Sequence, residues 1–191
     1  MIKIGIIGDI GAGKSHISKM FGYPVFNADH EVIKIYKSSK SCYRKIKKIF
    51  PKHFFSFPIK KSQIMNVIFE NGSNLKKITK IIHPEVNNRM KKFIKKNKNK
   101  KLIILDVPLL LENKINKKDD ILVFIESNKK ETYKRLKKRK NFNFKLFKKF
   151  KKIQLPLEIK KKKSTYKLKN NFINKFLKKD IKILLGEILR K

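Results

Sequence analysis

The chain has 191 residues, 40% of them hydrophobic, and a formal net charge of +38. This length suits one domain with a buried core, and a single cysteine excludes an internal disulfide framework. No apolar run reaches the length of a membrane span, and the first residues lack a signal-peptide pattern, so we expect a cytoplasmic protein.

The positive charge is weak evidence for a nucleic-acid partner. Lysine supplies 47 of the 52 basic residues and arginine only five, although arginine is the better bidentate ligand for phosphates and guanine edges. Lys, Ile, Asn and Phe are abundant, and all are encoded by A/T-rich codons. We therefore attribute the charge to codon drift at tolerant surface positions and expect no specific nucleic-acid partner.

Strands and helices are predicted to alternate along most of the chain. Apolar segments predict strands at 2–7, 24–29, 101–111 and 121–126, and a last short strand is expected at 165–170. Helical periodicity covers 14–21, 31–98, 129–140, 143–163 and 172–190. Unbroken apolar runs such as those at 101–111 and 121–126 are typical of parallel strands buried on both faces.

The glycine loop at residues 8–15, GDIGAGKS, fits the phosphate-binding pattern G-x-x-x-x-G-K-[ST] between a predicted strand and a predicted helix. Glycines let the backbone wrap an anion with its N–H groups, and the following helix adds its positive end. Lys14 is expected to reach the β- and γ-phosphates of ATP, and the Ser15 hydroxyl to coordinate Mg²⁺. Chance would give roughly 0.004 such matches in this chain, so the loop predicts a nucleotide site.

With this loop, the alternation predicts an α/β fold: a P-loop NTPase with three α/β/α layers around a five-stranded parallel sheet. We expect one domain over residues 1–191, with a core at 1–30, 99–140 and 164–191, an insertion of helices at about 31–98, and further basic helices at about 141–163.

A second motif, NKKD at residues 116–119, fits the guanine-reading N-K-x-D pattern of GTPases. Chance would give about 0.12 such matches. The segment precedes a predicted strand instead of following one, and no D-x-x-G ends the preceding strand. We therefore assign it no role in binding guanine.

Two carboxylates are placed at the ends of successive predicted strands, the edge where open α/β sheets bind ligands. Asp29 is expected to end the second strand and Asp106 the third. A small kinase needs a carboxylate near the γ-phosphate to take the proton of the acceptor hydroxyl, and Asp106 is a candidate partner of Ser15 on Mg²⁺. A helix N-cap for Asp29 and a turn before Pro108 for Asp106 are the alternative interpretations.

Five segments in order resemble the dephospho-CoA kinase family, over nearly the whole chain. They are GDIGAGKS (the family's GGIGSGKS), NAD at 27–29 (its D-A-D), IIHPEV at 81–86 (its L-H-P), DVPLLLEN at 106–113 (its D-x-P-L-L-F-E), and 154–171 (its Q-x-P-x-x-E-K…A-D-x-V-I-D-N block). The resemblance implies transfer of the ATP γ-phosphoryl group to the ribose 3′-hydroxyl of dephospho-CoA, giving coenzyme A, with ATP and Mg²⁺ required. It also implies a single kinase domain, in which the helices at about 31–98 form the inserted substrate lobe and those at about 141–163 form the lid.

The resemblance also implies roles at the matched positions. Asp29 would be the general base, acting with Lys14 and Arg139. The residues expected to hold ATP are Gly8, Gly11, Ala12, Gly13, Lys14, Ser15, His16, Arg135 and Arg139. The residues expected on the acceptor side are Asp29, His83, Pro84, Pro108, Leu109, Leu110 and Glu112, and the candidate metal ligands remain Ser15 and Asp106. A helix-start turn is the alternative for His83-Pro84, and plain core packing for the leucines.

Three departures from the family pattern lie close to the expected site: Asp9 replaces a loop glycine, His16 the usual Thr, and Asn27 the first Asp of D-A-D. Two other functions stay open: a P-loop kinase of a nucleoside monophosphate or another small metabolite, and a basic nucleic-acid-binding protein with a vestigial nucleotide site. The expected partner is the small molecule dephospho-CoA, without a membrane, in a monomer or weak homo-oligomer.

Overall fold

The computed structural model describes residues 1–139 and 142–190. It consists of two compact units: unit 1 contains Met1–Asn27 and Asn97–Lys191, and unit 2 contains Ala28–Lys96. The boundary that we expected between core and lid, at residues 140–141, and the last residue of the expected core, 191, lie outside the described residues.

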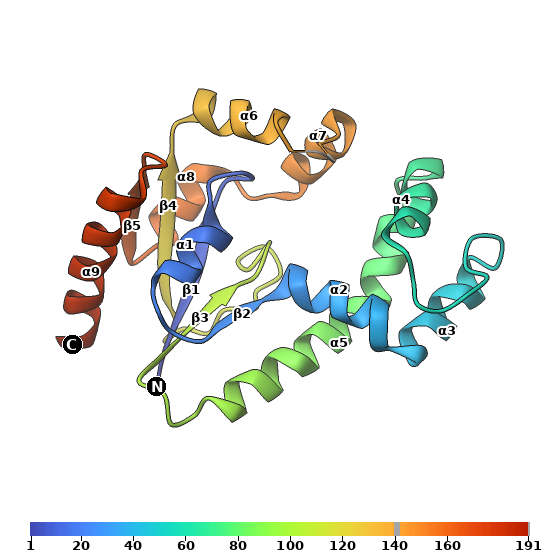
Figure 1. The fold of residues 1–191 in the computed structure, drawn as a ribbon, viewed down its shortest axis with the longest axis horizontal. Helices are drawn as coiled ribbons and strands as arrows, with labels where there is room; N and C mark the ends of the chain where they lie inside the picture. The colour runs from blue at the N-terminus through green and yellow to red at the C-terminus, as the bar shows by residue number, and fades with distance from the viewer. Residues whose placement is uncertain (140–141, 191) are drawn as a thin grey trace. The chain divides into compact units, whose positions relative to one another are not determined.

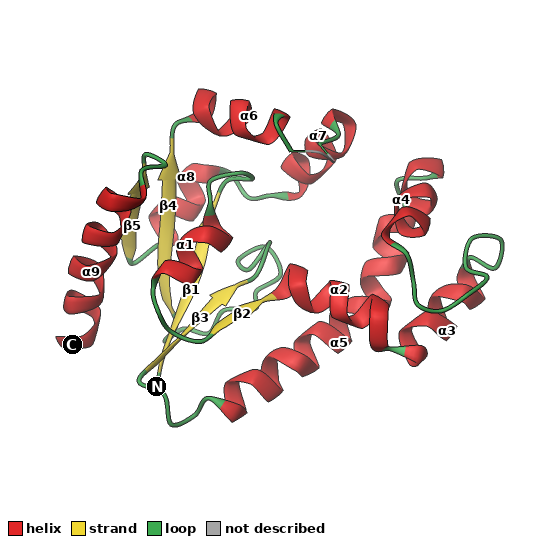
Figure 2. Ribbon diagram, viewed as in Figure 1, coloured by secondary structure: helices red, strands yellow, loops and turns green. Residues whose placement is uncertain are grey.

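Unit 1 is built on five parallel strands in the order β2-β3-β1-β4-β5 (Figures 1 and 2). The strands are β1 (Ile2–Gly8), β2 (Val25–Asn27), β3 (Leu102–Asp106), β4 (Ile121–Ser127) and β5 (Tyr166–Asn170). Each overlaps one of the apolar segments predicted to form a strand, so the predicted five-stranded parallel α/β fold is confirmed.

The central strand β1 is buried on both faces. Ile4 and Ile6 are fully buried in a core that includes residues of α1 (Lys14–Met20) and α9 (Asn174–Arg190). Gly5 points to the other face, where an added Cβ would lie 2.5 Å from Leu110 Cδ2. The apolar run from Ile4 to Ile7 follows from this burial, because neither face of the strand meets water there, whereas Lys3 before it is half-buried.

Three more helices complete unit 1: α6 (Lys129–Lys137), α7 (Phe144–Ile153) and α8 (Leu157–Lys163). Pro156 forms the N-cap of α8, as its missing N–H permits at a helix start. The last of these helices contacts β1 and β4. None of the described α7 side chains is buried, and the Phe147 ring of α7 packs against Tyr133 of α6 with the ring centroids 6.1 Å apart.

Unit 2 contains the helices α2 (Ala28–Ser38), α3 (Lys40–Ile49), α4 (Lys61–Glu70) and α5 (Asn74–Lys96). The long helix α5 contacts each of the other three. Its own buried side chains are Ile78, Ile82 and Val86, spaced at helical intervals along one face. The segment predicted as helical over 31–98 is therefore helical, and its helices are interrupted near Pro51, Pro58 and Gly72.

One expectation and one alternative interpretation of local structure are wrong. Asp29 does not end a strand: β2 pairs with β3 only as far as Asn27 opposite Asp106, and Asp29 lies in the first turn of α2. β2 is an edge strand of three residues, so its ladder ends before the sequence pattern does. His83-Pro84 is not a helix start either, because both residues lie inside α5.

Across the described residues, no helix combines the length and the apolar character that crossing a membrane requires.

Candidate active site

The glycine loop joins β1 to α1 at the carboxyl edge of the sheet, and its backbone requires glycine. Gly11 and Gly13 have φ of 82° and 88°, in the left-handed region that side chains disfavour. An added Cβ at Gly13 would also lie 2.6 Å from Asn170 Nδ2, and one at Gly11 would lie 2.7 Å from Leu136 Cγ. The loop is therefore fixed by both backbone conformation and close packing.

The Lys14 side chain folds back over this loop. Its Nζ donates to the backbone carbonyls of Asp9 at 2.8 Å and Gly8 at 3.3 Å. Carbonyl oxygens are neutral acceptors, and charged phosphate oxygens are stronger ones. The ammonium group thus lies at the loop, where it can exchange these acceptors for an anion.

Asn27 links the two candidate metal ligands of unit 1. Its Nδ2 donates to Asp106 Oδ2 and lies 3.4 Å from Ser15 Oγ. Asp106 is 2% exposed and ends β3, whereas Ser15 is exposed in the first turn of α1. Among the described residues no group of three His, Cys, Asp or Glu side chains could hold a metal ion. A hydroxyl and a carboxylate still suit Mg²⁺, which keeps several waters and takes the rest of its ligands from phosphates.

Asn170 supports the loop from the end of β5, and the sequence did not single it out. Its Nδ2 donates to Ala12 O at 2.8 Å, and its Oδ1 accepts from Phe172 N at 2.8 Å. The residue is 3% exposed, and its bond to Ala12 O is fully buried. The sequence feature that could have identified Asn170 is its match to the last Asn of the family's A-D-x-V-I-D-N block.

The two arginines expected to contact ATP lie at the end of α6 and just after it. The Arg135 guanidinium stacks 4.3 Å from the ring centroid of Phe172, and its Nε donates to Glu131 Oε1 at 2.8 Å. Arg139 is exposed, and its backbone N–H bonds Leu136 O at 3.1 Å. Arg135 is therefore oriented next to the segment that carries Asn170, and the ATP-binding role of both arginines stays a prediction.

His16 and Asp9, the two unusual loop residues, both have partners. His16 Nε2 lies 2.9 Å from Asn174 Oδ1, which joins α1 to the start of α9. Asp9 Oδ1 accepts from Ile10 N at 2.7 Å, and its Oδ2 pairs with Lys151 of α7 at 2.6 Å. Neither side chain touches Lys14 Nζ in these contacts.

The segment after β3 is fixed by backbone and core contacts. Leu109 has a φ of 58°, which is strained for a branched side chain, and Leu110 is buried against Gly5. Pro108 is half-buried beside them. These leucines fit the alternative that we gave for their side chains, namely core packing, and their acceptor-binding role is not tested.

Glu112, also expected on the acceptor side, forms a buried ion pair. Its Oε1 accepts from Lys160 Nζ at 2.8 Å and from Leu155 N at 2.9 Å, and the Glu112 and Lys160 side chains are 9% and 4% exposed. Burial raises the pKa of this carboxyl, but hydrogen bonds from Lys160 and backbone N–H groups, with the charge of Lys160, outweigh it. The net pKa of Glu112 lies below its usual value.

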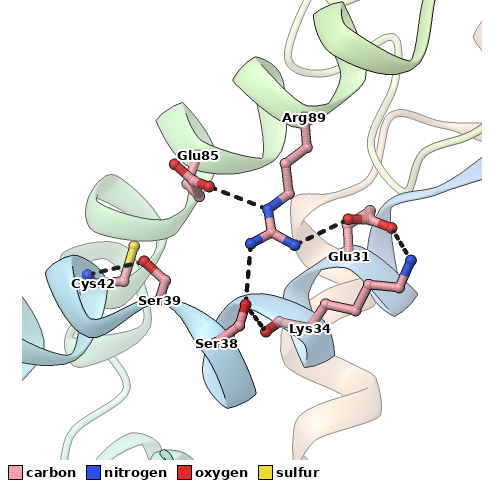
Figure 3. Close-up of polar contacts among 7 residues, drawn as sticks. All are labelled: Glu31, Lys34, Ser38, Ser39, Cys42, Glu85 and Arg89. Carbon is pink, nitrogen blue, oxygen red and sulfur yellow. Dashed lines mark hydrogen bonds and ion pairs between the residues drawn. The ribbon is translucent and has the colours of Figure 1, made fainter. Parts of the chain in front are cut away.

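In unit 2, Arg89 ties the helix that carries Asp29 to the helix that carries His83 (Figure 3). Its guanidinium donates to Glu31 at 3.2 Å, to Glu85 at 3.1 Å and to Ser38 at 3.3 Å. Burial raises the pKa of Glu31, but the hydrogen bonds and positive charges of Lys34 and Arg89 lower it by more. The net pKa of Glu31 is therefore below its ordinary value. None of these contacts was predicted from the sequence.

Asp29 and His83 thus lie on two helices of unit 2 that are joined by these bonds. His83 and Pro84 are exposed on α5, and partial desolvation of the imidazole lowers the pKa of His83 below its ordinary value. A neutral imidazole at physiological pH can donate and accept one hydrogen bond each.

The family model and the similar curated proteins indicate one family. Residues 2–175 match the family model of dephospho-CoA kinase. A dephospho-CoA kinase from Wolbachia sp. subsp. Brugia malayi (strain TRS) is 33% identical over 168 residues, which cover 85% of this chain and 86% of the relative. One from Rickettsia felis is 31% identical over 194 residues, covering 100% of both chains. The solved dephospho-CoA kinase from Campylobacter jejuni has the same fold, with a TM-score of 0.67 at 19% identity, covering 99% of this chain and 98% of that chain.

Proposed function

This chain belongs to the dephospho-CoA kinase family and is an ATP-dependent kinase of dephospho-CoA, and we propose that residues 8–15 hold the ATP while Asp29 activates the ribose 3′-hydroxyl. The observation that carries the proposal is the fixed glycine loop with the Lys14 ammonium folded over it. A loop of this shape presents backbone N–H groups and one mobile cation to a triphosphate.

Lys14 is proposed to contact the phosphate oxygens on which negative charge develops during phosphoryl transfer. In the structure its ammonium donates to two neutral carbonyls. With ATP bound, the β- and γ-phosphate oxygens replace these acceptors, because they carry charge. The ammonium then stabilises the charge that develops on the bridging oxygen as the γ-phosphoryl group leaves.

Asp29 is proposed to take the proton of the attacking hydroxyl. It lies in the first turn of α2, where the positive end of the helix favours the ionised carboxylate that a base requires. The bonds from Arg89 hold α2 against α5, so Asp29 and His83 are supported by one packed pair of helices. On the acceptor side we assign supporting contacts to His83, Pro84 and Pro108, and to the Leu109–Leu110 backbone.

The bonding of Glu112 modifies its proposed role. Since Lys160 and the Leu155 N–H already occupy Oε1, we assign Glu112 mainly to holding the segment after β3 in place. Arg135 and Arg139 remain proposed nucleotide ligands. For Arg135, the stacking on Phe172 orients the planar guanidinium before ATP binds.

Mg²⁺ is proposed to bind through the Ser15 hydroxyl and the Asp106 carboxylate, both next to Asn27. When bound, the ion would neutralise charge on the β- and γ-phosphates. Asn27 donates a hydrogen bond to Asp106 and so orients one of its two oxygens. We also propose a cytoplasmic enzyme that acts without a specific nucleic-acid partner, as a monomer or weak homo-oligomer.

The function is tested by a coupled ADP-release assay with dephospho-CoA, AMP, CMP and shikimate as separate acceptors. We expect saturable, ATP-dependent turnover with dephospho-CoA and only background ADP release with the other three. Turnover with AMP or CMP and none with dephospho-CoA would instead support a nucleoside monophosphate kinase. Tight duplex or single-strand binding that persists near physiological salt would contradict the absence of a nucleic-acid partner.

A further inference from the structure

The second residue of the glycine loop is an acid, which is unfavourable for a loop that receives a triphosphate. Asp9 stands where the related loop sequence has glycine, and its side chain is 15% exposed. Oδ1 accepts from the next backbone N–H, of Ile10, so the carboxylate is fixed to the loop itself. Another anion arriving at this loop would be repelled unless a cation compensates Asp9.

A compensating cation is supplied from a distant part of the chain. Lys151 of α7 places its Nζ 2.6 Å from Asp9 Oδ2, across a sequence separation of 142 residues. The described α7 lysines also include Lys145, Lys148, Lys149 and Lys152, but the ion pair with the loop is made by Lys151. The pair therefore brings one specific ammonium group of α7 to the loop that is expected to hold phosphates.

The pair is suited to exchange. The Lys151 side chain is 45% exposed, so its ammonium group can leave Asp9 without leaving a buried site. Exposed pairs of single charges are weak. A triphosphate offers an ammonium group several charged oxygens in place of one carboxylate.

We propose that Lys151 is a further ATP-binding residue, and that the Asp9 carboxylate holds it at the loop until the triphosphate of ATP replaces that carboxylate. Asp9 then acts as a positioning residue for Lys151. Because the carboxylate holds the ammonium group, Lys151 leaves Asp9 only when the triphosphate of ATP is bound. The proposal rests on the proposed function, because it takes residues 8–15 as the ATP site.

The test is a double-mutant cycle on ATP affinity, measured by isothermal titration calorimetry at about 0.15 M salt without any acceptor. The variants are Asp9→Asn, Lys151→Gln and the double variant. Lys152→Gln, alone and with Asp9→Asn, is the matched control, because it removes the same charge from the neighbouring α7 residue. Circular dichroism melts check that every variant is folded.

We expect Lys151→Gln to weaken ATP binding by about tenfold in the Asp9→Asn background, the effect of losing one charge-assisted hydrogen bond. When Asp9 is retained, Lys151→Gln should weaken ATP binding less. The substitution then removes the contact of Lys151 with ATP, but it also removes the Lys151–Asp9 ion pair that ATP would otherwise have to break. Asp9→Asn alone should tighten binding by about threefold. Lys152→Gln should change the affinity less than twofold in both backgrounds.

The decisive comparison is the effect of Lys151→Gln when Asp9 is already neutral. If Lys151 only neutralised Asp9, removing it from the Asp9→Asn variant would leave ATP affinity unchanged, and that result would overturn the proposal. An equal loss with Lys152→Gln would also overturn it, since it would show an effect of net charge alone. An unmutated chain that binds no ATP would instead refute the proposed function, whereas normal turnover of dephospho-CoA with no effect of Lys151→Gln would refute this inference only.

Discussion

Replacing Lys160 by methionine should destabilise the enzyme strongly, because Lys160 is the buried partner of Glu112. The ammonium and the carboxylate lie 2.8 Å apart, and both side chains are almost excluded from water, at 4% and 9% exposure. Methionine keeps most of the side-chain volume but leaves the Glu112 charge without its cation. Removing one partner of a buried pair costs about 3–5 kcal/mol, so the free energy of unfolding should fall by that amount at neutral pH.

The pH dependence of this loss has a definite sign. The folded-state pKa of Glu112 is below its ordinary value of 4.5. The pair therefore contributes its full stability above pH 4.5 and loses it as the pH falls through the depressed pKa. Without Lys160, burial should raise the pKa of Glu112. As the pH falls, Glu112 should therefore be protonated at a higher pH in the variant than in the unmutated chain. The difference in unfolding free energy should consequently be largest at neutral pH and shrink in acid.

Urea denaturation of the unmutated chain, Lys160→Met and Glu112→Gln/Lys160→Met measures this. The glutamine Oε1 can still accept from Leu155 N, so the double variant should recover most of the lost stability. A loss below about 1 kcal/mol for Lys160→Met would refute the reasoning, because that size is typical of an exposed pair. A double variant as unstable as Lys160→Met would refute it too, since the unpaired charge would not then be the cause.

Three further substitutions test the site. Asp29→Asn should lower turnover by about 10²–10⁴-fold, as expected for the loss of a general base, with ATP affinity nearly unchanged in calorimetry; a collapse of ATP binding would mean a structural role. Lys14→Ala should damage both ATP affinity and turnover, because its ammonium is proposed to contact the β- and γ-phosphates throughout the reaction; unchanged ATP affinity would count against that contact. Asn170→Ala removes the buried hydrogen bond to Ala12 O of the glycine loop and the partly buried bond from Phe172 N, so we expect about 1–3 kcal/mol of lost stability and a higher KM for ATP. If its KM for ATP stayed the same, Asn170 would not be shaping the nucleotide loop.

The sequence predicted β3 and β4 because they are apolar runs with both faces buried, and β1 is buried in the same way, with Ile4 and Ile6 on one face and Gly5 on the other. The glycine loop was predictable for a similar reason. Its left-handed residues and close contacts tolerate only glycine, so the backbone requirement is visible in the sequence at Gly11 and Gly13.

The contacts that position the site were not predictable in the same way. Asn170 and Ala12, Glu112 and Lys160, and Asp9 and Lys151 are each separated by 48 or more residues, and each pair depends on how strands and helices meet in space. The end of β2 was also misplaced, because it is set by pairing with β3 and not by the apolar pattern of residues 24–29. Local patterns predict elements, while the partners of single polar side chains depend on the tertiary fold.

The most direct test of the central claim is to identify the product formed from ATP and dephospho-CoA by ³¹P nuclear magnetic resonance and mass spectrometry. We predict one new phosphomonoester, on the ribose 3′-hydroxyl, formed in equal amount to ADP and absent with Asp29→Asn over the same time. A phosphate at another position, or ADP released without any phosphorylated acceptor, would contradict the account.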